Sequence, residues 1–120
     1  MWKRPVGRPK NQAMSGKRYP VELISIEPST RKNKRFVATF LLDDDKYHKT
    51  HFGLKDPKYG TYIDHKDETR RKNYVARHLT MEGDYVFNPL TASSLSMFIL
   101  WGPYPDIEEN IKVFKEMFNV

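Results

Sequence analysis

Residues 36–52 read FVATFLLDDDKYHKTHF, and this stretch decides the fold class. Residues 36–42 are rich in the residue types that favour strands, and residues 47–52 alternate well enough to form another strand. The polar residues between them form a turn, at Asp43, Asp44, Asp45 and Lys46. The stretch therefore predicts two antiparallel strands joined by a short connection.

A third strand is predicted upstream, beginning near Tyr19. Apolar side chains separated by polar ones indicate a half-buried strand, at Val21, Leu23, Ile24 and Ile26. Residues 28–30 then supply a turn, and residues 31–35 a cationic loop. Three consecutive strands with short connections predict an antiparallel meander.

Downstream of the strands the pattern changes to that of helices. Residues 53–62 contain Gly and Pro and are expected to form a loop, and a mostly polar helix is predicted from Asp64 to about His78. A second helix is predicted to begin at Thr91, after Asn88 and Pro89, and to end at Gly102. The last helix has one apolar face, formed by Ile107, Ile111, Phe114 and Phe118.

These elements predict an α+β domain, in which a small three-stranded antiparallel sheet is followed by about three helices. We expect residues 19–120 to form this single domain, since the length of 120 residues fits one core. Residues 1–18 lack periodicity and contain four Pro and Gly residues. They are expected to form an extended basic arm that is disordered unless a partner binds it.

The positive charge of the chain belongs to this arm. The whole sequence has 21 Lys and Arg against 15 Asp and Glu, a net charge of +6. Residues 1–18 contain no acidic residue and six basic ones, which are Lys3, Arg4, Arg8, Lys10, Lys17 and Arg18. The remaining 102 residues are therefore neutral overall. The charge indicates an anionic partner for the arm and says little about the domain.

The arm contains a motif for the minor groove of DNA. Residues 3–10 read KRPVGRPK and resemble an AT-hook, whose core is Gly7, Arg8 and Pro9. Gly7 allows close approach of the backbone, and the Arg8 side chain fits a narrow A·T-rich groove. Lys3, Arg4 and Lys10 would reach phosphates. The same residues also fit a basic arm that binds any acidic surface, of protein or nucleic acid, and both interpretations stay open.

Two further basic features lie in the domain. The first is the loop with Arg31, Lys32, Lys34 and Arg35. The second is the polar helix, on which Lys66, Arg70, Asn73 and Arg77 recur at spacings of 4, 3 and 4 and would share one face. Such a stripe could follow a phosphate backbone, although a solvated helix face is the commoner outcome.

No catalytic constellation is visible in the sequence. There is no Cys, which excludes thiolate metal sites and a Cys nucleophile. His48 and His51 are three apart on a predicted strand and should point to opposite faces, so that they cannot chelate one metal ion. The three acids at residues 43–45 fit a soluble turn better than a nuclease centre. We therefore expect no enzyme activity, no metal and no cofactor.

A membrane-bound or secreted protein is not indicated either. The longest uncharged window, residues 85–105, is interrupted by Asn, Pro, Gly and Ser and predicts a buried helix in place of a membrane span. The charged start of the chain lacks the apolar run of a signal peptide.

Residues 36–118, about two thirds of the chain, are similar to a family of small uncharacterised proteins of nucleocytoplasmic large DNA viruses. The resemblance is carried by an ordered set of motifs: His51-Phe52-Gly53, His65-Lys66-Asp67, Arg71, Tyr74, Arg77 and His78, Asn88-Pro89, Thr91-Ala92, Leu100-Trp101, Ile111 and Phe118. It implies a viral, non-enzymatic protein without an active site that could be transferred. His65, Asp67, Tyr74, Arg77 and His78 are expected to link the polar helix to the sheet.

Two hypotheses of function follow. The first is a virion-associated structural protein, a minor capsid component assembled in the host cytoplasm, whose arm binds neighbouring virion proteins. The second is an accessory protein that binds or condenses A·T-rich DNA through its arm. No small-molecule substrate is expected in either case.

Overall fold

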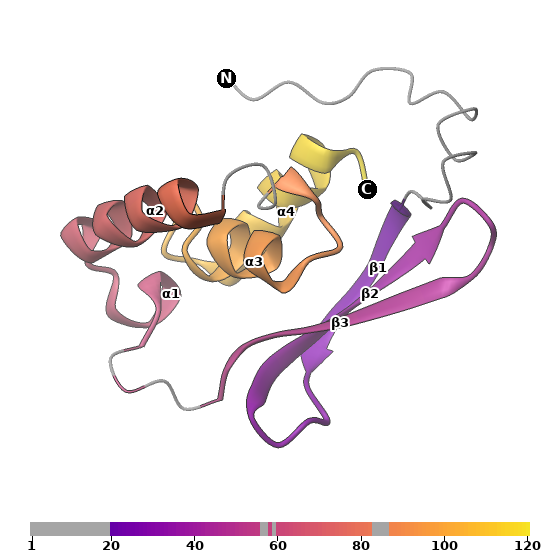
Figure 1. Cartoon of the computed structure of the whole chain (residues 1–120), viewed down its shortest axis with the longest axis horizontal. Helices are drawn as coiled ribbons and strands as arrows, with labels where there is room; N and C mark the ends of the chain where they lie inside the picture. Colours follow the sequence, from indigo (N-terminus) through magenta and orange to yellow (C-terminus); the bar gives the residue numbers. More distant parts are fainter. Residues whose placement is uncertain (1–19, 56–57, 59, 83–86) are drawn as a thin grey trace.

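The fold has two layers, a twisted sheet and a group of helices that covers one of its faces (Figure 1). The computed structural model describes residues 20–55, 58, 60–82 and 87–120. The arm at residues 1–18 lies outside these residues. Within the described part of the chain no helix is long and apolar enough to cross a membrane.

The sheet is a three-stranded antiparallel meander in the order β1-β2-β3. The strands are β1 (Pro20–Pro28), β2 (Lys34–Leu42) and β3 (Tyr47–Leu54). The turn between β2 and β3 is closed by a hydrogen bond from the Leu42 backbone N to the Lys46 carbonyl, at 2.8 Å, and Asp45 takes the positive φ of 66° that it requires. The predicted fold class and all three strands are confirmed.

The pairing register decides which face of the sheet is buried. Phe36 pairs with Phe52 and Phe40 with His48, so these residues point toward the helices. The core on that side combines strand and helix residues, namely Leu23, Ala38, Phe40, Leu42, Phe52, Leu95, Ile99, Leu100, Phe114 and Phe118. The opposite face of the sheet carries Val37 paired with His51. His48 and His51 thus lie on opposite faces, as predicted.

The predicted polar helix is in fact two helices, α1 (Tyr62–His65) and α2 (Glu68–Glu82). The single-helix prediction from Asp64 to His78 was wrong because Lys66 adopts a left-handed conformation, with φ 58°, and ends α1. Asp67 then accepts hydrogen bonds from the backbone N atoms of Thr69 and Arg70 and so begins α2.

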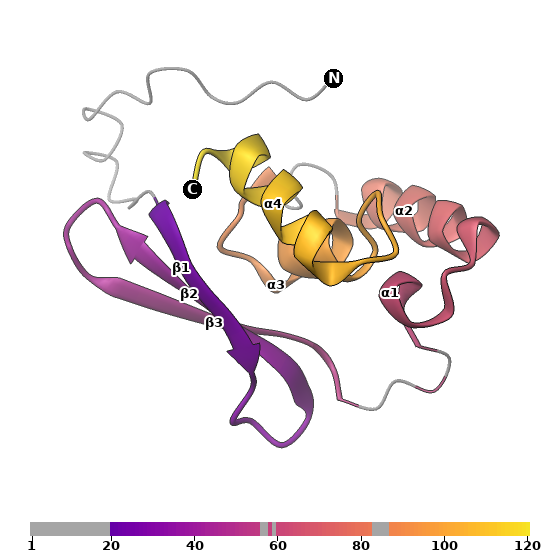
Figure 2. The same cartoon turned by 180° about the vertical axis from the view of Figure 1, so that it is seen from behind.

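The two apolar helices lie against the sheet. Thr91 caps α3 (Ala92–Leu95) by accepting a hydrogen bond from the Ser94 backbone N, as the predicted helix start requires. The chain continues as the π-helical turn η3 (Ser96–Leu100). The last helix, α4 (Ile107–Phe118), crosses α3 on the side seen in Figure 2. In both views α2 lies beyond α3, away from the sheet.

Candidate functional site: an aromatic stack, a pocket and a cationic tip

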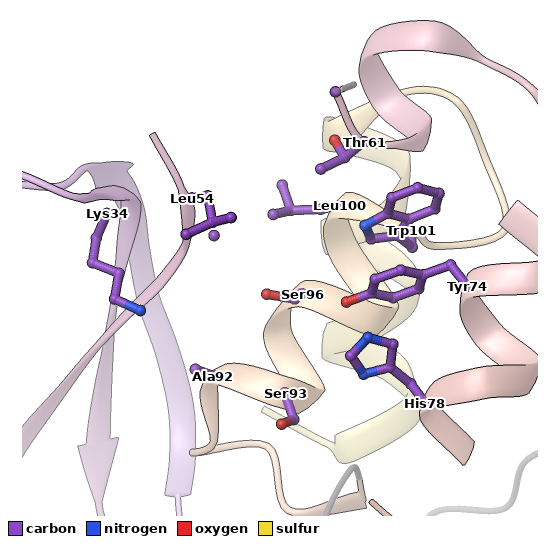
Figure 3. Close-up of a pocket in the computed structure, with 12 residues that line it drawn as sticks. Lys34, Leu54, Thr61, Tyr74, His78, Ala92, Ser93, Ser96, Leu100 and Trp101 are labelled. Carbon is purple, nitrogen blue, oxygen red and sulfur yellow. The ribbon is translucent and has the colours of Figure 1, made fainter. Parts of the chain in front are cut away.

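Three aromatic side chains form a continuous stack between α2 and the end of η3. Tyr74 and His78 are four residues apart on α2 and share a face, with ring centroids 4.0 Å apart. On its other side Tyr74 lies parallel to Trp101, at 4.1 Å and an interplanar angle of 4°. Figure 3 shows Tyr74 between the other two rings. Contacts of this kind contribute roughly 0.5 to 1.5 kcal/mol each beyond their buried area.

Hydrogen bonds to the backbone hold Trp101 in place. Arg71, one turn before Tyr74, donates from Nε to the carbonyl oxygens of Trp101, at 3.1 Å, and Gly102. His65 packs edge-on against the indole at 5.2 Å, and its Nδ1 accepts a hydrogen bond from the Asp67 backbone N. The stack is therefore fixed from α1, α2 and η3 together. The contacts of His65 and Tyr74 with Trp101 thus link α1 and α2 to the end of η3.

Asn110 fixes the loop that follows Trp101. Its side chain is fully buried, its Nδ2 donates to the carbonyls of Ile99 and Tyr104 at 2.8 and 2.7 Å, and its Oδ1 accepts from the Tyr104 backbone N. Gly102 packs so closely against Asn110 that any Cβ there would lie 2.6 Å from its Cγ. Sequence reasoning missed Asn110, although it lies three residues after Ile107 and four before Phe114, on the predicted buried face.

A pocket of about 340 Å³ lies between this stack and the sheet. Its aromatic wall is Trp101, Tyr74 and His78, and its apolar part is formed by Leu54, Ala92 and Leu100. In Figure 3 the Tyr74 hydroxyl and the Trp101 indole nitrogen lie on the side of their rings toward the pocket. The remaining lining residues are Lys34, Gly53, Gly60, Thr61, Ser93 and Ser96. The pocket thus combines apolar side chains with polar groups and a cation.

The Arg35–Asp64 ion pair holds one border of the pocket. Arg35 donates from both terminal nitrogens to Asp64, each at 2.8 Å, and the Thr61 backbone N and Oγ1 also donate to Asp64 at 2.8 Å. Arg35 and the Thr61 bonds hold the pKa of Asp64 well below its usual range, against the opposing effect of burial. The pair ties β2 to α1 and so positions Thr61.

The end of the sheet beside the pocket carries a group of cations, here called the cationic tip, formed by Arg31, Lys32, Lys34 and Lys55. Its backbone is ordered by hydrogen bonds from Arg31 N to Ser29 Oγ, at 2.9 Å, and from Lys55 N to the Asn33 carbonyl, at 3.2 Å. His51 hydrogen-bonds to the same Ser29 hydroxyl at 2.7 Å.

The pKa of His51 is affected by cations at and near the tip. Burial lowers the pKa of His51 from its ordinary value, and the charges of Arg31, Lys49 and Lys34 lower it further. The three cations come from β2, β3 and the loop between β1 and β2.

The structure brings only part of the predicted site together. Arg31 and Lys32 are exposed at the tip, and Lys34 lies partly buried at the pocket. Arg35, predicted with them, turns to Asp64, and its charge is neutralised there. The tail residues Lys3, Arg4, Gly7, Arg8, Pro9, Lys10, Lys17 and Arg18 lie outside the described residues.

The predicted basic stripe on the polar helix does not form as expected. Lys66 has a left-handed conformation and lies before the start of α2. It therefore does not continue the helix face that carries Arg70 and Arg77. Arg70 and Asp67 form an ion pair with 3.7 Å between Nε and Oδ2. Among the described residues, no group of three His, Cys, Asp or Glu side chains could hold a metal ion.

A comparison with known protein families gave a match to the first half of the domain. Residues 24–78 match a family of unknown function, DUF5754. The DUF5754 match runs from Ile24 in β1 to His78 in α2, and so includes most of the sheet, the Arg35–Asp64 pair and two of the three stacked rings. Trp101 and the helices after α2 lie outside it. Neither the curated proteins nor the solved structures gave a significant match to this chain.

Proposed function

We propose that this chain is a non-enzymatic structural protein of a large DNA virus particle, a minor capsid component that binds neighbouring proteins through cationic surfaces. The observation that carries the proposal is the cationic tip, where hydrogen bonds from Arg31 N to Ser29 Oγ and from Lys55 N to the Asn33 carbonyl hold Arg31, Lys32, Lys34 and Lys55 at one end of the sheet. It gives the domain a positive surface at one end although residues 19–120 are neutral overall. The cationic arm adds a second positive element.

The order of the tip favours a partner with a defined surface. A loop held by backbone hydrogen bonds loses little conformational entropy when it binds, so more of the electrostatic attraction is retained as affinity. The resemblance to proteins of large DNA viruses supplies the setting, a virion assembled in the host cytoplasm. Charge complementarity of this kind specifies partner and orientation more than it raises affinity.

Two measurements test this proposal. Quantitative proteomics of purified particles should find the chain among the virion proteins, and its absence would refute the capsid role. In the second, the double variant Arg31→Glu, Lys32→Glu should lose crosslinks to neighbouring particle proteins. The matched control is Lys46→Glu, which reverses an exposed charge in the turn at the other end of β2 and should keep the crosslinks.

The second candidate function is binding of A·T-rich DNA, which the sequence of Gly7, Arg8 and Pro9 favours. It predicts a gel shift that prefers A·T-rich duplexes and weakens steeply with salt, because cations released from the DNA drive binding. Arg8→Ala should weaken that shift, with Lys17→Ala as the control outside the motif. An unchanged affinity in Arg8→Ala would exclude the AT-hook mode.

A further inference from the structure

The pocket beside the stack is continuous with the cationic tip through Lys34. Lys34 is part of the cationic tip and also lines the pocket. It would therefore contact both a ligand in the pocket and an anionic group bound at the tip. Leu54 at the mouth is 65% exposed, so a partner that covers it would bury apolar surface beside the cations.

The geometry of the rings argues against a nucleobase as the occupant. Bases bind proteins by stacking on aromatic faces. Both faces of Tyr74 are covered, one by Trp101 at 4.1 Å and the other by His78 at 4.0 Å, and His65 packs against Trp101. The edges of the rings, with their polar atoms, face the pocket (Figure 3). A side chain that fits among edges matches this wall better than a flat base.

The pocket is large enough for a single large side chain. Pockets for small molecules and cofactors span about 300 to 1,000 Å³, and this pocket, at about 340 Å³, is at the lower end. Protein interfaces concentrate their binding energy in a few large side chains buried in such pockets. Leu54, Ala92 and Leu100 would contact the apolar part of such a side chain.

We propose that this pocket receives one large apolar side chain from an acidic segment of a neighbouring protein, and that carboxylates flanking this side chain contact Lys34 and the cationic tip. The inference rests on the proposed function in taking a protein as the partner, and it names the chemistry of that partner. The apolar side chain supplies the burial, and the acidic residues supply the charge complementarity that selects the segment.

Fluorescence of Trp101 tests the proposal directly. The chain has two tryptophans, so Trp2→Phe leaves Trp101 as the only one, in the wall of the pocket. The probe is a blocked peptide with one Phe flanked by two Glu on each side. We expect a saturable change in Trp101 emission with a dissociation constant on the order of 0.1 to 1 mM, as for a ligand that fills one pocket.

Matched peptides separate the two parts of the recognition. Replacing the Phe by Ala should abolish the change although the charge is kept, and replacing Glu by Gln should weaken binding although the Phe is kept. Equal binding of either peptide overturns the proposal. Adenosine monophosphate serves as the nucleotide probe, and tighter binding of it than of the Phe peptide also overturns the proposal.

Variants of the protein give the second arm of the test. Lys34→Glu should weaken peptide binding about fivefold or more, because an attraction becomes a repulsion. Leu54→Asp changes an exposed residue at the mouth and should abolish binding without unfolding the domain, which circular dichroism verifies. Lys46→Glu, far from the pocket, should bind like the parent protein. Unchanged peptide binding in Lys34→Glu or in a folded Leu54→Asp variant refutes the proposal that the pocket binds this segment.

The failures of the two proposals can be distinguished. If Arg31→Glu, Lys32→Glu loses its particle crosslinks and Leu54→Asp keeps them, the pocket proposal fails and the proposed function stands. If the chain is absent from particles and the Phe peptide still saturates Trp101, the virion role fails and the recognition chemistry of the pocket stands.

Discussion

Replacing Asp64 by Asn is the sharpest test of how the pocket border is held. The Asp64 carboxylate accepts two hydrogen bonds from Arg35 and two from Thr61, all at 2.8 Å. An amide keeps the shape of the side chain. It loses the negative charge and one acceptor oxygen, so the bidentate contact with Arg35 cannot persist.

The expected cost follows from the geometry and the exposure of the pair. Hydrogen bonds to charged groups contribute roughly 1.5 to 3 kcal/mol each when shielded, whereas exposed ion pairs contribute about 0.2 to 1 kcal/mol. The side chains of Arg35 and Asp64 are 25% and 36% exposed, so solvent screens the pair in part. We expect Asp64→Asn to lower the free energy of unfolding by about 1 to 2 kcal/mol.

Urea unfolding of the parent, Asp64→Asn, Arg35→Gln and the double variant measures this cost as a double-mutant cycle. We expect a coupling free energy of about 1 kcal/mol between Arg35 and Asp64. Asp43→Asn, in the exposed turn between β2 and β3, is the control for loss of a negative charge. A coupling below about 0.3 kcal/mol would refute the reasoning, because pairs without interaction add to within that error.

The pH dependence gives an independent check with a defined sign. Because the folded-state pKa of Asp64 is lowered below its ordinary value of 3.8, the stabilisation is fully present above pH 3.8 and is lost as the pH falls below it. The difference in unfolding free energy between the parent and Asp64→Asn should therefore shrink as the solution is acidified. A difference that stays constant down to about pH 2 would contradict a charge-based contribution.

The remaining predictions concern the packing after Trp101 and the tip. Gly102→Ala should lower the unfolding free energy by about 3 kcal/mol or more, because its Cβ would overlap the Phe98 carbonyl and crowd Asn110; urea unfolding measures this. Asn110→Ala should cost about 2 to 4 kcal/mol by the same assay, since it removes the hydrogen bonds to the buried Ile99 carbonyl and the part-buried Tyr104 carbonyl. The pKa of His51 in the folded state is lower than its ordinary value of 6.5, so protonation of His51 favours the unfolded state. The stability that neutral His51 contributes is therefore present above pH 6.5 and is lost as the pH falls below it. His51→Gln should accordingly remove part of the stability slope between about pH 7 and pH 5, and an NMR titration should give a His51 pKa below that of a model peptide.

The sheet was predictable because its signals are local. Residues 36–52 contain both the alternation of the strands and the polar turn, so no distant contact is needed to place them. The last helix was predictable for the same reason, since Ile107, Ile111, Phe114 and Phe118 repeat at helical spacing and all pack in or against the core.

The parts that sequence reasoning missed depend on contacts between distant residues. Arg35 was expected at a cationic surface, but Asp64, 29 residues later, draws it inward. The break at Lys66 is decided by one left-handed residue, and Lys carries no local signal for that conformation. In the sequence, Trp101 was recognised only as part of the Leu100-Trp101 motif near the end of a predicted helix. Its role in the pocket depends on Tyr74, which α2 brings to it from 27 residues away.

The π-helical turn η3 has a consequence for the length of the chain. Its wider turn is closed by the hydrogen bond from the Trp101 backbone N to the Ser96 carbonyl, five residues back, at 3.0 Å. Such a turn holds one residue more than an α-helical turn between the same two ends. The segment η3 therefore contains one residue more than an α-helical turn needs. Deletion of one residue from η3 would leave an ordinary α-helical turn with Trp101 still in place. A loss of one residue in α2 before Tyr74 would instead rotate Tyr74 and His78 by about 100° relative to the start of that helix.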